Sequence, residues 1–432
     1  MAERYRMKLP ESVEIGDITV RDGLQTLEHY FPLEKKLLLA EELILAGFKR
    51  IEVTNFGNPK AMPQFKDAEE LLIKLFESKK VGSKLRQNGG DVWVTIITIN
   101  ERAVTRALDF KSNHGYGPDI ILQMISTEPH HHKVNSGMTQ DEYWKMTEKC
   151  IKMAKEQGVE MCGTVSTIWG SPMEGNRLID LKKAVEFSKI YLDLGASYIE
   201  QADHDGSADP ARVYEYFTMI LDPALMGKWA DPRYHLAHFH TSRGMGLVNY
   251  LAALQAGINR FETTLSGTGG QPANMVDGKI TGGTGAYYHK EHLLSGICGT
   301  EDTVVMMEAM GIKTGIDIPK LLNLGRMFRD QYLKISPEDR DAIVQNVSQL
   351  TGISRQKLSA LKGTDNLIDT LVEEAMAFID KSGEEKNKPR KDAIAQLLNS
   401  LRGYLTSGMW GLSRAETLIS DVPPSPHLKH LL

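Results

Sequence analysis

Two histidines separated by one residue, His238 and His240, form the pair whose spacing most directly suggests metal chemistry. On a β-strand, side chains two residues apart point to the same side. Two imidazoles aimed at one point can share a metal ion. Because His-x-His also occurs on ordinary half-buried strands, the pair needs support from the rest of the chain.

Other polar side chains directly follow short β-prone runs. Asp22 follows the first run, and with His238 and His240 it supplies one carboxylate and two imidazoles. This set suits Mg²⁺, Mn²⁺, Co²⁺ or Zn²⁺ with positions left open for water. Each residue alone could be a turn or cap residue, but their recurrence after most runs favours a site. The remaining polar residues of this kind are Arg21, Gln25, Glu52, Asn55, Ser126, Thr127, Glu128, Ser166, Thr167, Asp203, His204 and Asp205.

The elements that must position these residues alternate regularly between residues 13 and 315. The predicted strands are residues 13–18, 50–54, 92–97, 120–125, 160–165, 198–201, 234–239 and 260–264. Apolar residues with helical periodicity predict helices at 34–46, 64–78, 101–109, 140–157, 178–194, 210–221 and 244–256. Eight strands alternating with helices predict an α/β fold, a closed (β/α)₈ TIM barrel rather than a doubly wound sheet. The chemistry of such a barrel sits at the carboxyl ends of its strands.

Beyond residue 316 the pattern predicts helices only, at 319–332, 337–351, 354–362, 367–380 and 391–406. We therefore expect two regions, a barrel domain at 1–316 and an all-helical region at 317–432. The helical region could cap the barrel, contribute to a dimer interface or bind a regulator.

Composition limits the possible partners and compartment. The chain has 432 residues, 41% of them hydrophobic, and a formal charge of −5, so a large core is expected and nucleic acid is an unexpected partner. No apolar run approaches the roughly 20 residues needed to span a bilayer. The three cysteines, Cys150, Cys162 and Cys298, have neither disulfide-framework nor zinc-knuckle spacing. We expect a cytoplasmic protein that does not bind membranes.

Several motifs resemble one known superfamily. The stretch 19–25 (Thr-Val-Arg-Asp-Gly-Leu-Gln), together with His238-Phe239-His240, is similar to the signature of the metal-dependent lyases and synthases built on a TIM barrel. Members include 3-hydroxy-3-methylglutaryl-CoA (HMG-CoA) lyase, isopropylmalate and homocitrate synthases, and Re-type citrate synthase. Stretches 165–175, 269–272 (Gly-Gly-Gln-Pro) and 300–311 resemble the lyase branch. The likeness covers roughly residues 13–330.

The resemblance implies a role for each matching residue. Asp22, His238 and His240 would hold the metal, with Mg²⁺ or Mn²⁺ favoured over Co²⁺ or Zn²⁺. Arg21 would stabilise the enolate oxygen that forms when a carbon–carbon bond beside a carbonyl breaks or forms. The remaining catalytic residues implied are Glu52, Asp203 and Gln25. The substrate-binding residues implied are Thr127, His130, Thr167 and Gln271. The superfamily also implies a homodimer.

Two positions depart from the lyase pattern. Gln271 stands where the lyases carry a catalytic cysteine, and an amide cannot act as a general acid or base as a thiol can. Ile297 falls on or near the position of the family's fourth metal ligand, an asparagine, and cannot coordinate. The extra segment 273–295 and Cys298 offer candidate replacements for the lost groups. The candidate residues in the segment are Asn274, Asp277, His289 and His292.

Three functions remain open at this point. The first is a metal-dependent lyase that breaks a carbon–carbon bond through an enolate in a carboxylated 3-hydroxyacyl-CoA or a related 2-oxo or hydroxy acid. The second is a Claisen synthase that condenses acetyl-CoA with a 2-oxo acid, because the stretch 126–130 (Ser-Thr-Glu-Pro-His) resembles the synthase branch. The third is a barrel that has lost catalysis and serves as a binding subunit.

Overall fold

The computed structural model describes residues 7–25, 30–60, 62–171, 179–204, 206–241, 244–270, 275–276, 279–280, 296–332, 345, 348 and 354–359. The chain divides into two compact units, Met1–Phe328 and Arg329–Leu432. The first unit holds the candidate site and is described here first.

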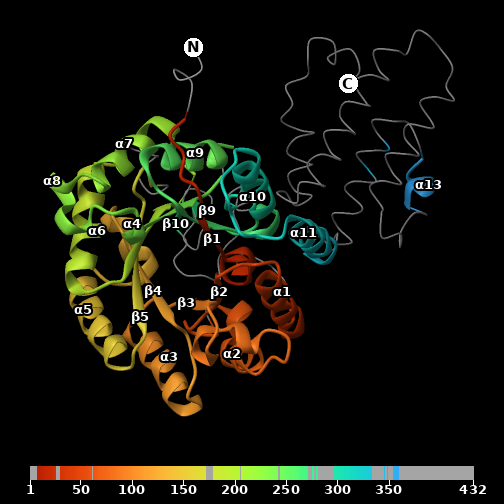
Figure 1. Ribbon diagram of the computed structural model, residues 1–432. Coiled ribbons are helices and arrows are strands. Elements are labelled where there is room, and N and C mark those ends of the chain that lie inside the picture. Colours follow the sequence, from red (N-terminus) through yellow and green to blue (C-terminus); the bar gives the residue numbers. More distant parts are fainter. Residues whose placement is uncertain are drawn as a thin grey trace, which may run out of the picture. The chain divides into compact units, whose positions relative to one another are not determined.

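Eight parallel strands close into a barrel in chain order, as the sequence predicted (Figure 1). Strands β1 and β8 pair from Glu14 with Arg260 to Asp17 with Thr263, and this pairing closes the ring. The strands are β1 (Glu14–Asp17), β2 (Arg50–Asn55), β3 (Trp93–Ile97), β4 (Ile120–Ser126), β5 (Glu160–Ser166), β6 (Tyr198–Asp203), β7 (His235–Phe239) and β8 (Arg260–Thr263). Each lies within two residues of its predicted bounds.

Helices surround the barrel on the outside (Figure 1). Polar side chains fix where several of them begin: Asn100 accepts a hydrogen bond from the amide of Ala103, and Thr139 and Glu142 form a reciprocal capping box. The helices of this unit are α1 (Leu33–Leu45), α2 (Ala68–Phe76), α3 (Glu101–His114), α4 (Pro129–Ser136), α5 (Gln140–Glu156), α6 (Leu181–Leu194), α7 (Pro210–Ile220), α8 (Pro223–Met226), α9 (Gly246–Ala256) and α10 (Thr300–Ala309). A two-stranded antiparallel sheet, β9 (Met275–Val276) with β10 (Lys279–Ile280), lies in the segment after β8.

The helix predicted at 64–78 begins later in the structure, so the prediction was wrong for residues 64–67. A short 3₁₀ turn, Pro63–Phe65, precedes α2, which starts only at Ala68. Polar contacts explain the break, because the side chain of Gln64 accepts a hydrogen bond from the amide of Phe31 at 2.7 Å. Asp67 forms a buried ion pair with Lys36 at 2.8 Å. These contacts tie the segment to the start of α1 instead of letting it continue as helix.

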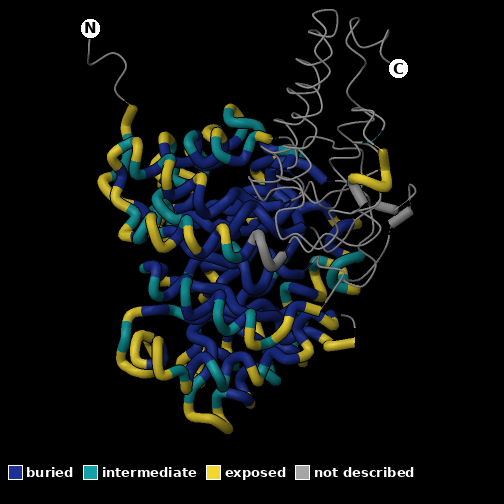
Figure 2. The backbone as a smooth tube through the Cα atoms, turned by 90° about the vertical axis from the view of Figure 1, so that its right-hand side faces the viewer, coloured by how far each residue is buried: buried dark blue, intermediate teal, exposed yellow. Residues whose placement is uncertain are grey.

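The barrel interior is layered. Apolar side chains pack together at one level of the barrel, and Figure 2 shows buried residues throughout the middle of this unit. This layer consists of Ile97, Ile120, Leu122, Cys162, Tyr198 and Leu236. One step further along several strands the interior becomes charged, because Glu200 follows Tyr198 and His238 follows Leu236 at the two-residue spacing of a strand. The candidate site therefore lies directly beyond this apolar layer.

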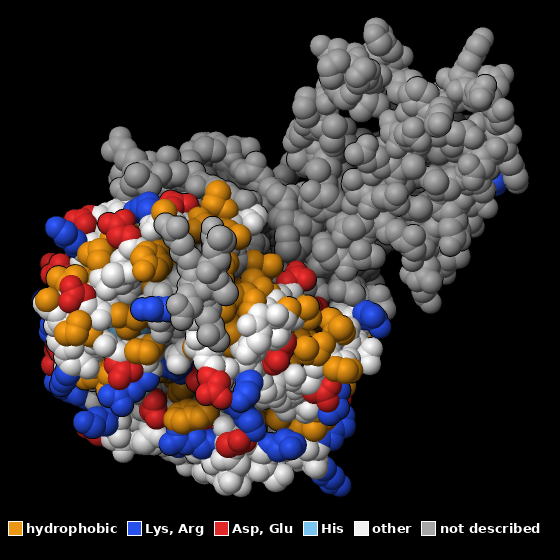
Figure 3. All heavy atoms as spheres, turned by 45° about the horizontal axis from the view of Figure 1, so that its top comes forward, with side chains coloured by type: hydrophobic (Ala, Val, Ile, Leu, Met, Phe, Trp, Pro, Cys, Tyr) orange, Lys and Arg blue, Asp and Glu red, His pale blue; other side chains and the backbone are white. Residues whose placement is uncertain are grey.

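The C-terminal region is described only in part. Helix α11 (Ile318–Tyr332) and the short helix α13 (Arg355–Ser359) fall within the helices predicted at 319–332 and 354–362, apart from the first residue of α11. The helices predicted at 367–380 and 391–406, and nearly all of 337–351, lie outside the described residues. In the described part of the chain, no helix combines the length and the apolar character needed to cross a membrane. Figure 3 shows acidic and basic side chains intermingled over the described face of the barrel.

Candidate metal-dependent active site

His238 and His240 lie at the carboxyl end of β7 and share one side of it. Their Nε2 atoms are 3.3 Å apart and both residues are buried. Nδ1 of His238 lies 3.1 Å from Oε2 of Glu262 on β8 and 3.5 Å from Oε1 of Glu200 on β6. If Nδ1–H donates to Glu262, the lone pair of Nε2 faces His240. A carboxylate that holds one ring nitrogen while the other faces a shared point is typical of a metal-ligating histidine.

The two carboxyl groups beside His238 have different electrostatic surroundings. Glu262 also forms an ion pair with Arg50, whose guanidinium crosses the barrel interior. Although burial alone would raise it, Arg50 and His238 lower the pKa of Glu262 to about 2. Burial, together with the charges of Glu262 and Glu52, raises the pKa of Glu200 well above its usual range. Glu200 therefore holds its proton more tightly than Glu262 does.

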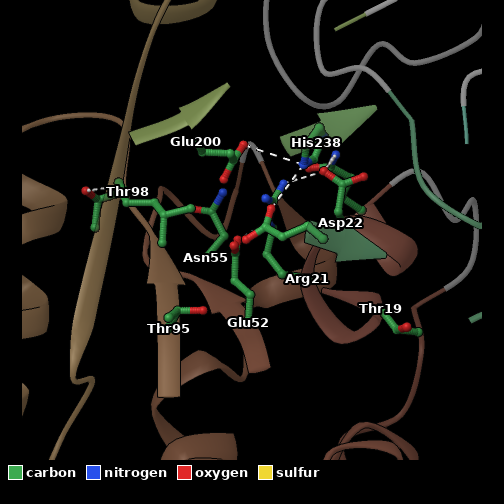
Figure 4. Close-up of polar contacts among 12 residues, drawn as sticks. Thr19, Arg21, Asp22, Glu52, Asn55, Thr95, Thr98, Glu200 and His238 are labelled. Carbon is green, nitrogen blue, oxygen red and sulfur yellow. Dashed lines mark hydrogen bonds and ion pairs between the residues drawn. The ribbon is translucent and has the colours of Figure 1, made fainter. Parts of the chain in front are cut away.

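A cation could be held on either side of the His238 ring. On the Nδ1 side, the ligand atoms of Glu200, His238 and Glu262 all lie within 4.8 Å of one another. On the Nε2 side lie His240 and, in Figure 4, Asp22. The Arg50 guanidinium already neutralises Glu262, so a cation on the Nδ1 side would face a positive charge. The charge of Arg50 therefore favours the Nε2 side, with Glu262 orienting the ring.

Arg21 and Asp22 are brought into the barrel mouth by one wide turn, Thr19–Gly23, after β1. The amides of Arg21, Asp22 and Gly23 all donate to the carbonyl of Ile18. Such π-type turns are frequent at functional sites. The guanidinium of Arg21 contacts the carboxylates of both Asp22 and Glu52, and Figure 4 shows it between them. Arg21 is thus held in place on two sides.

Gln25 ties Asp22 to the glycine loop after β8. Its amide nitrogen donates to Oδ2 of Asp22 at 2.8 Å and to the carbonyl of Gly270 at 2.6 Å. Gly269 has a φ of +117°, and a Cβ there would lie 2.5 Å from Oδ1 of Asp22. Only glycine allows this close approach. Gln271, the next predicted site residue, lies outside the described residues, as do Asn274, Asp277, His289 and His292.

Glu52 on β2 is buried, and one of its oxygens has no hydrogen-bond partner among the described residues. Burial raises the pKa of Glu52 to about 7, against the opposing charge of Arg21. A carboxyl group with a pKa near neutrality can accept and return a proton at physiological pH. The position of Glu52 beside Arg21 is thus suited to proton transfer.

Thr127 and Thr167 form a hydroxyl pair at the ends of β4 and β5. Their Oγ1 atoms are 3.0 Å apart, and the Thr127 hydroxyl also donates to the carbonyl of Thr167 at 2.7 Å. Thr167 has a φ of +57°, a left-handed conformation that a β-branched residue rarely adopts. Backbone strain of this kind gathers at functional sites.

The three consecutive histidines after β4, His130 to His132, belong to helix α4, for which the sequence analysis predicted no helix. Pro129 begins the helix, and the carboxylate of Glu128 caps it by accepting hydrogen bonds from the amides of His130 and His131. The predicted substrate residue His130 is exposed, whereas His131 is buried. The helix phase set by this cap turns His131 inward, where its ring packs edge-on against His204 at 4.7 Å.

Asp203 ends β6, and its carboxylate accepts hydrogen bonds from the amides of Ser207 at 3.1 Å and Ala208 at 3.2 Å. It therefore shapes the loop that carries His204. Ile297 is fully buried and bridges to His240 through the backbone, so an apolar side chain does border the histidine pair. Cys298 packs close to Gly246, and burial raises the pKa of its thiol, which makes it a poor replacement acid or base.

Sequence reasoning missed four residues of this site: Arg50, His131, Glu200 and Glu262. Three of them are buried charged side chains within strands: Arg50 begins β2, Glu200 lies in β6 and Glu262 lies in β8. An ionisable residue within a predicted buried strand was the signal that could have identified them. His131 could have been found only by recognising that Pro129 starts a helix.

The residues present fit a divalent cation. Two facing imidazole nitrogens 3.3 Å apart, a carboxylate orienting one ring and a second carboxylate beside them form a donor set for such an ion. A closed parallel barrel with this set at its strand ends defines the class of the molecule, the metal-dependent barrel enzymes.

The family follows from comparison with known proteins. The model of the HMGL-like family matches residues 12–328, so the chain belongs to that family. An HMG-CoA lyase of Bacillus subtilis is 27% identical over 77% of this chain and 97% of its own length. A cytoplasmic HMG-CoA lyase of mouse is 29% identical over 73% of this chain and 80% of its own. The predicted barrel and the predicted superfamily are both confirmed.

A solved structure gives the same result. An HMG-CoA lyase from Acinetobacter baumannii, in complex with coenzyme A and 3-methylmalate, superposes with a TM-score of 0.61 at 28% identity, covering 74% of this chain and 92% of that one. These relatives favour the lyase branch over the synthase branch and over a barrel without catalysis.

Proposed function

We propose that the protein is a divalent-metal-dependent lyase that cleaves a carbon–carbon bond in a carboxylated 3-hydroxyacyl-CoA. The observation that carries the proposal is the facing Nε2 pair of His238 and His240, with Arg21 and Asp22 together at the same barrel mouth. The HMG-CoA lyases among the relatives support the reaction class. HMG-CoA itself is one candidate substrate, and Gln271 in place of the family cysteine leaves related acyl-CoA compounds open.

In this proposal Asp22, His238 and His240 hold the metal, and Mg²⁺ or Mn²⁺ are the first ions to test. When bound, a divalent cation would act as a Lewis acid toward the hydroxyl and carbonyl oxygens of the substrate. Glu262 keeps His238 in the orientation and tautomer that present Nε2 to the site.

The proposed reaction is a retro-aldol cleavage. The substrate's 3-hydroxyl loses its proton, the bond between C2 and C3 breaks, C3 becomes a ketone, and the electron pair passes to C2 as the enolate of an acyl-CoA. C2 then takes up a proton. Arg21 stabilises the enolate oxygen with its fixed positive charge. Glu52 is the group we assign to proton transfer, because its pKa of about 7 lets it exchange a proton at neutral pH.

Other residues would position the substrate. Gln25 and the Thr127–Thr167 pair present amide and hydroxyl groups at the strand ends, where a carboxylate or carbonyl of the substrate could bind. Asp203 would hold the β6 loop in place. His130, exposed on α4, and Gln271 complete the proposed substrate contacts. The coenzyme A in the related lyase structure supports an acyl-CoA substrate.

Product analysis tests the proposal. Purified protein is incubated with Mn²⁺ or Mg²⁺ and HMG-CoA, and then with other carboxylated 3-hydroxyacyl-CoA compounds. Acyl-CoA and a keto acid should form in equal amounts, and the Asp22→Asn variant should form neither. A parallel incubation uses acetyl-CoA with oxaloacetate or pyruvate. Release of free CoA only when the 2-oxo acid is present would replace the lyase proposal with the Claisen synthase.

The assembly and location are also part of the proposal. We propose a homodimer, as in the family resemblance, with the all-helical region from residue 317 onward as a second domain. We also propose a cytoplasmic location, consistent with three buried free cysteines. Light scattering of the purified chain tests the dimer, and cell fractionation tests the location.

A further inference from the structure

His204 is a buried imidazole next to the candidate metal site that the proposed mechanism does not use. It follows β6 directly, and only 6% of its surface is exposed. Its Nε2 atom is buried and has no hydrogen-bond partner among the described residues. A buried polar atom without a partner is unfavourable and calls for an unseen ligand, water or ion.

The ring of His204 lies between two other imidazoles. Its centre is 4.7 Å from that of His131 and 6.0 Å from that of His240, whose own centre is 5.2 Å from His238. Two imidazoles bound to one ion through nitrogens about 2.1 Å away have ring centres roughly 5 to 6 Å apart. The ring centre of His240 lies at about this distance from the ring centres of both His238 and His204.

His131 fixes the far side of His204. Its Nδ1 atom lies 2.8 Å from the Ser126 hydroxyl and 3.2 Å from the side-chain nitrogen of Asn135. The Ser126 hydroxyl is in turn 3.0 Å from that of Ser166. His131 is therefore held by its own partners, and the ring of His204 packs against it.

On another flank of His240, the backbone of Ile297 bridges to it, and the Ile297 side chain, which cannot coordinate, is fully buried. With Asp22, His238 and His240 as three ligands, a fourth protein ligand would have to come from a different position than Ile297. Among the described residues, His204 is the neutral donor that adjoins His240 with a free nitrogen.

We propose that His204 is the fourth protein ligand of the metal held by Asp22, His238 and His240. This inference rests on the metal site of the proposed function. Among the described residues the three imidazoles do not yet converge on one point, since the group of ligand atoms within 4.8 Å is Glu200, His238 and Glu262. Coordination therefore requires the His204 ring to turn, and its Nε2 breaks no hydrogen bond in doing so.

The ligand set decides which metal the site prefers. Three imidazoles and one carboxylate suit Zn²⁺, Co²⁺ or Mn²⁺ better than Mg²⁺, which prefers oxygen ligands. With His204 removed, two imidazoles and a carboxylate remain, and the preference for transition ions over Mg²⁺ should weaken.

Metal binding tests this inference without relying on activity. Metal-free full-length protein is titrated with Co²⁺, followed by its visible absorption, in the wild type, His204→Ala and His204→Asn. Loss of an orienting residue alone lowers metal affinity by about 10- to 100-fold, so His204→Ala should lower Co²⁺ affinity at least about 100-fold and alter the spectrum. His204→Asn, which keeps an oxygen donor, should fall between. His114→Ala, which removes an exposed imidazole on α3, is the matched control and should bind Co²⁺ like the wild type.

The outcomes separate the inference from the proposed function. Wild-type affinity and spectrum in a folded His204→Ala variant would overturn the inference alone. A wild type that binds no Co²⁺, Mn²⁺ or Mg²⁺ would overturn the metal site itself. X-ray absorption of the Co²⁺-loaded wild type needs no variant: three imidazole ligands are expected, and two would overturn the role of His204.

Discussion

Glu262 and Glu200 lie on the same side of the His238 ring, 3.1 and 3.5 Å from its Nδ1 atom, yet the pKa of Glu262 is lowered and that of Glu200 is raised. The difference comes from Arg50, which contacts Glu262. A cationic partner favours the charged form of a buried carboxyl group, whereas burial without one favours the protonated form. We therefore expect the charge of Glu262, more than that of Glu200, to orient His238.

Two matched amide variants test whether Glu262 and Glu200 differ in this way. We expect Glu200 to keep its proton at pH 7, so that Glu200→Gln, a neutral group of the same shape, should change the free energy of unfolding by less than about 1 kcal/mol. Glu262→Gln leaves the Arg50 guanidinium buried without its partner, and should cost about 3 to 5 kcal/mol. Urea unfolding of the metal-free variants measures both.

The same two variants also test whether Glu262 orients His238 for metal binding. Glu262→Gln should also lower metal affinity by about 10- to 100-fold, since it weakens the hold on His238. Equal destabilisation by both variants would mean that both carboxyl groups are charged, and the assignment of the proton to Glu200 would be wrong.

The barrel could be predicted because its signals are local. Strand runs, helix caps and the glycines that end helices are read from neighbouring residues, so every strand was placed within two residues. Arg21, Asp22, His238 and His240 could be singled out because they lie at or just after strand ends, and parallel strands bring their carboxyl ends to one rim.

The rest of the site depends on relations that the sequence does not display. Glu200 and Glu262 lie within strands, and their meeting at His238 depends on the pairing and register of β6, β7 and β8. The inward direction of His131, instead of His130, depends on the helix phase set by Glu128. Strand register and helix phase are therefore what the structure adds.

Arg21 should matter to the chemical step more than to substrate binding. Its guanidinium contacts Glu52 and Asp22 at once, a geometry that a lysine ammonium cannot reproduce. Arg21→Lys should lower kcat by about 10²- to 10³-fold, the loss typical for removal of one oxyanion-stabilising donor. Steady-state kinetics with the acyl-CoA substrate measures this, with KM changing much less. Arg106→Lys, on the barrel exterior, is the control, and an equal loss there would argue against a specific role.

Removal of a metal held by Asp22, His238 and His240 should lower the stability of the fold. A ligand that binds only the folded state stabilises it by about 2.7 kcal/mol at a concentration of 100 times its Kd. Chelation should therefore lower the Tm of the wild type, and Mn²⁺ should restore it. Asp22→Asn removes one ligand's charge while keeping its shape, so its Tm should respond little. A wild-type Tm indifferent to chelator and to added ions would contradict the proposed metal site.

Asp17 at the end of β1 makes stability fall as pH rises. It is wholly buried and accepts hydrogen bonds from the amide of Thr19 and the hydroxyl of Thr300, both at 2.8 Å. Burial raises its pKa from the usual 3.8 to about 7. Because the folded state keeps a proton that the unfolded state releases, the stabilisation is complete below pH 4 and is lost as pH rises to 7.

The variant Asp17→Asn isolates this effect, because its amide oxygen can accept from Thr19 while its NH2 group donates to the Thr300 hydroxyl, and the amide does not ionise. The pKa difference corresponds to about 4 kcal/mol in all, and about 3 kcal/mol of it falls between pH 5 and pH 8. From pH 5 to pH 8, the free energy of unfolding of the variant should therefore rise by about 3 kcal/mol relative to that of the wild type. Urea unfolding at each pH would measure this difference. Asp91→Asn, at an exposed ion pair with Lys49, should show no such trend. A pH-independent difference for Asp17→Asn would mean that Asp17 is ionised in the fold, held by its two donors in spite of burial.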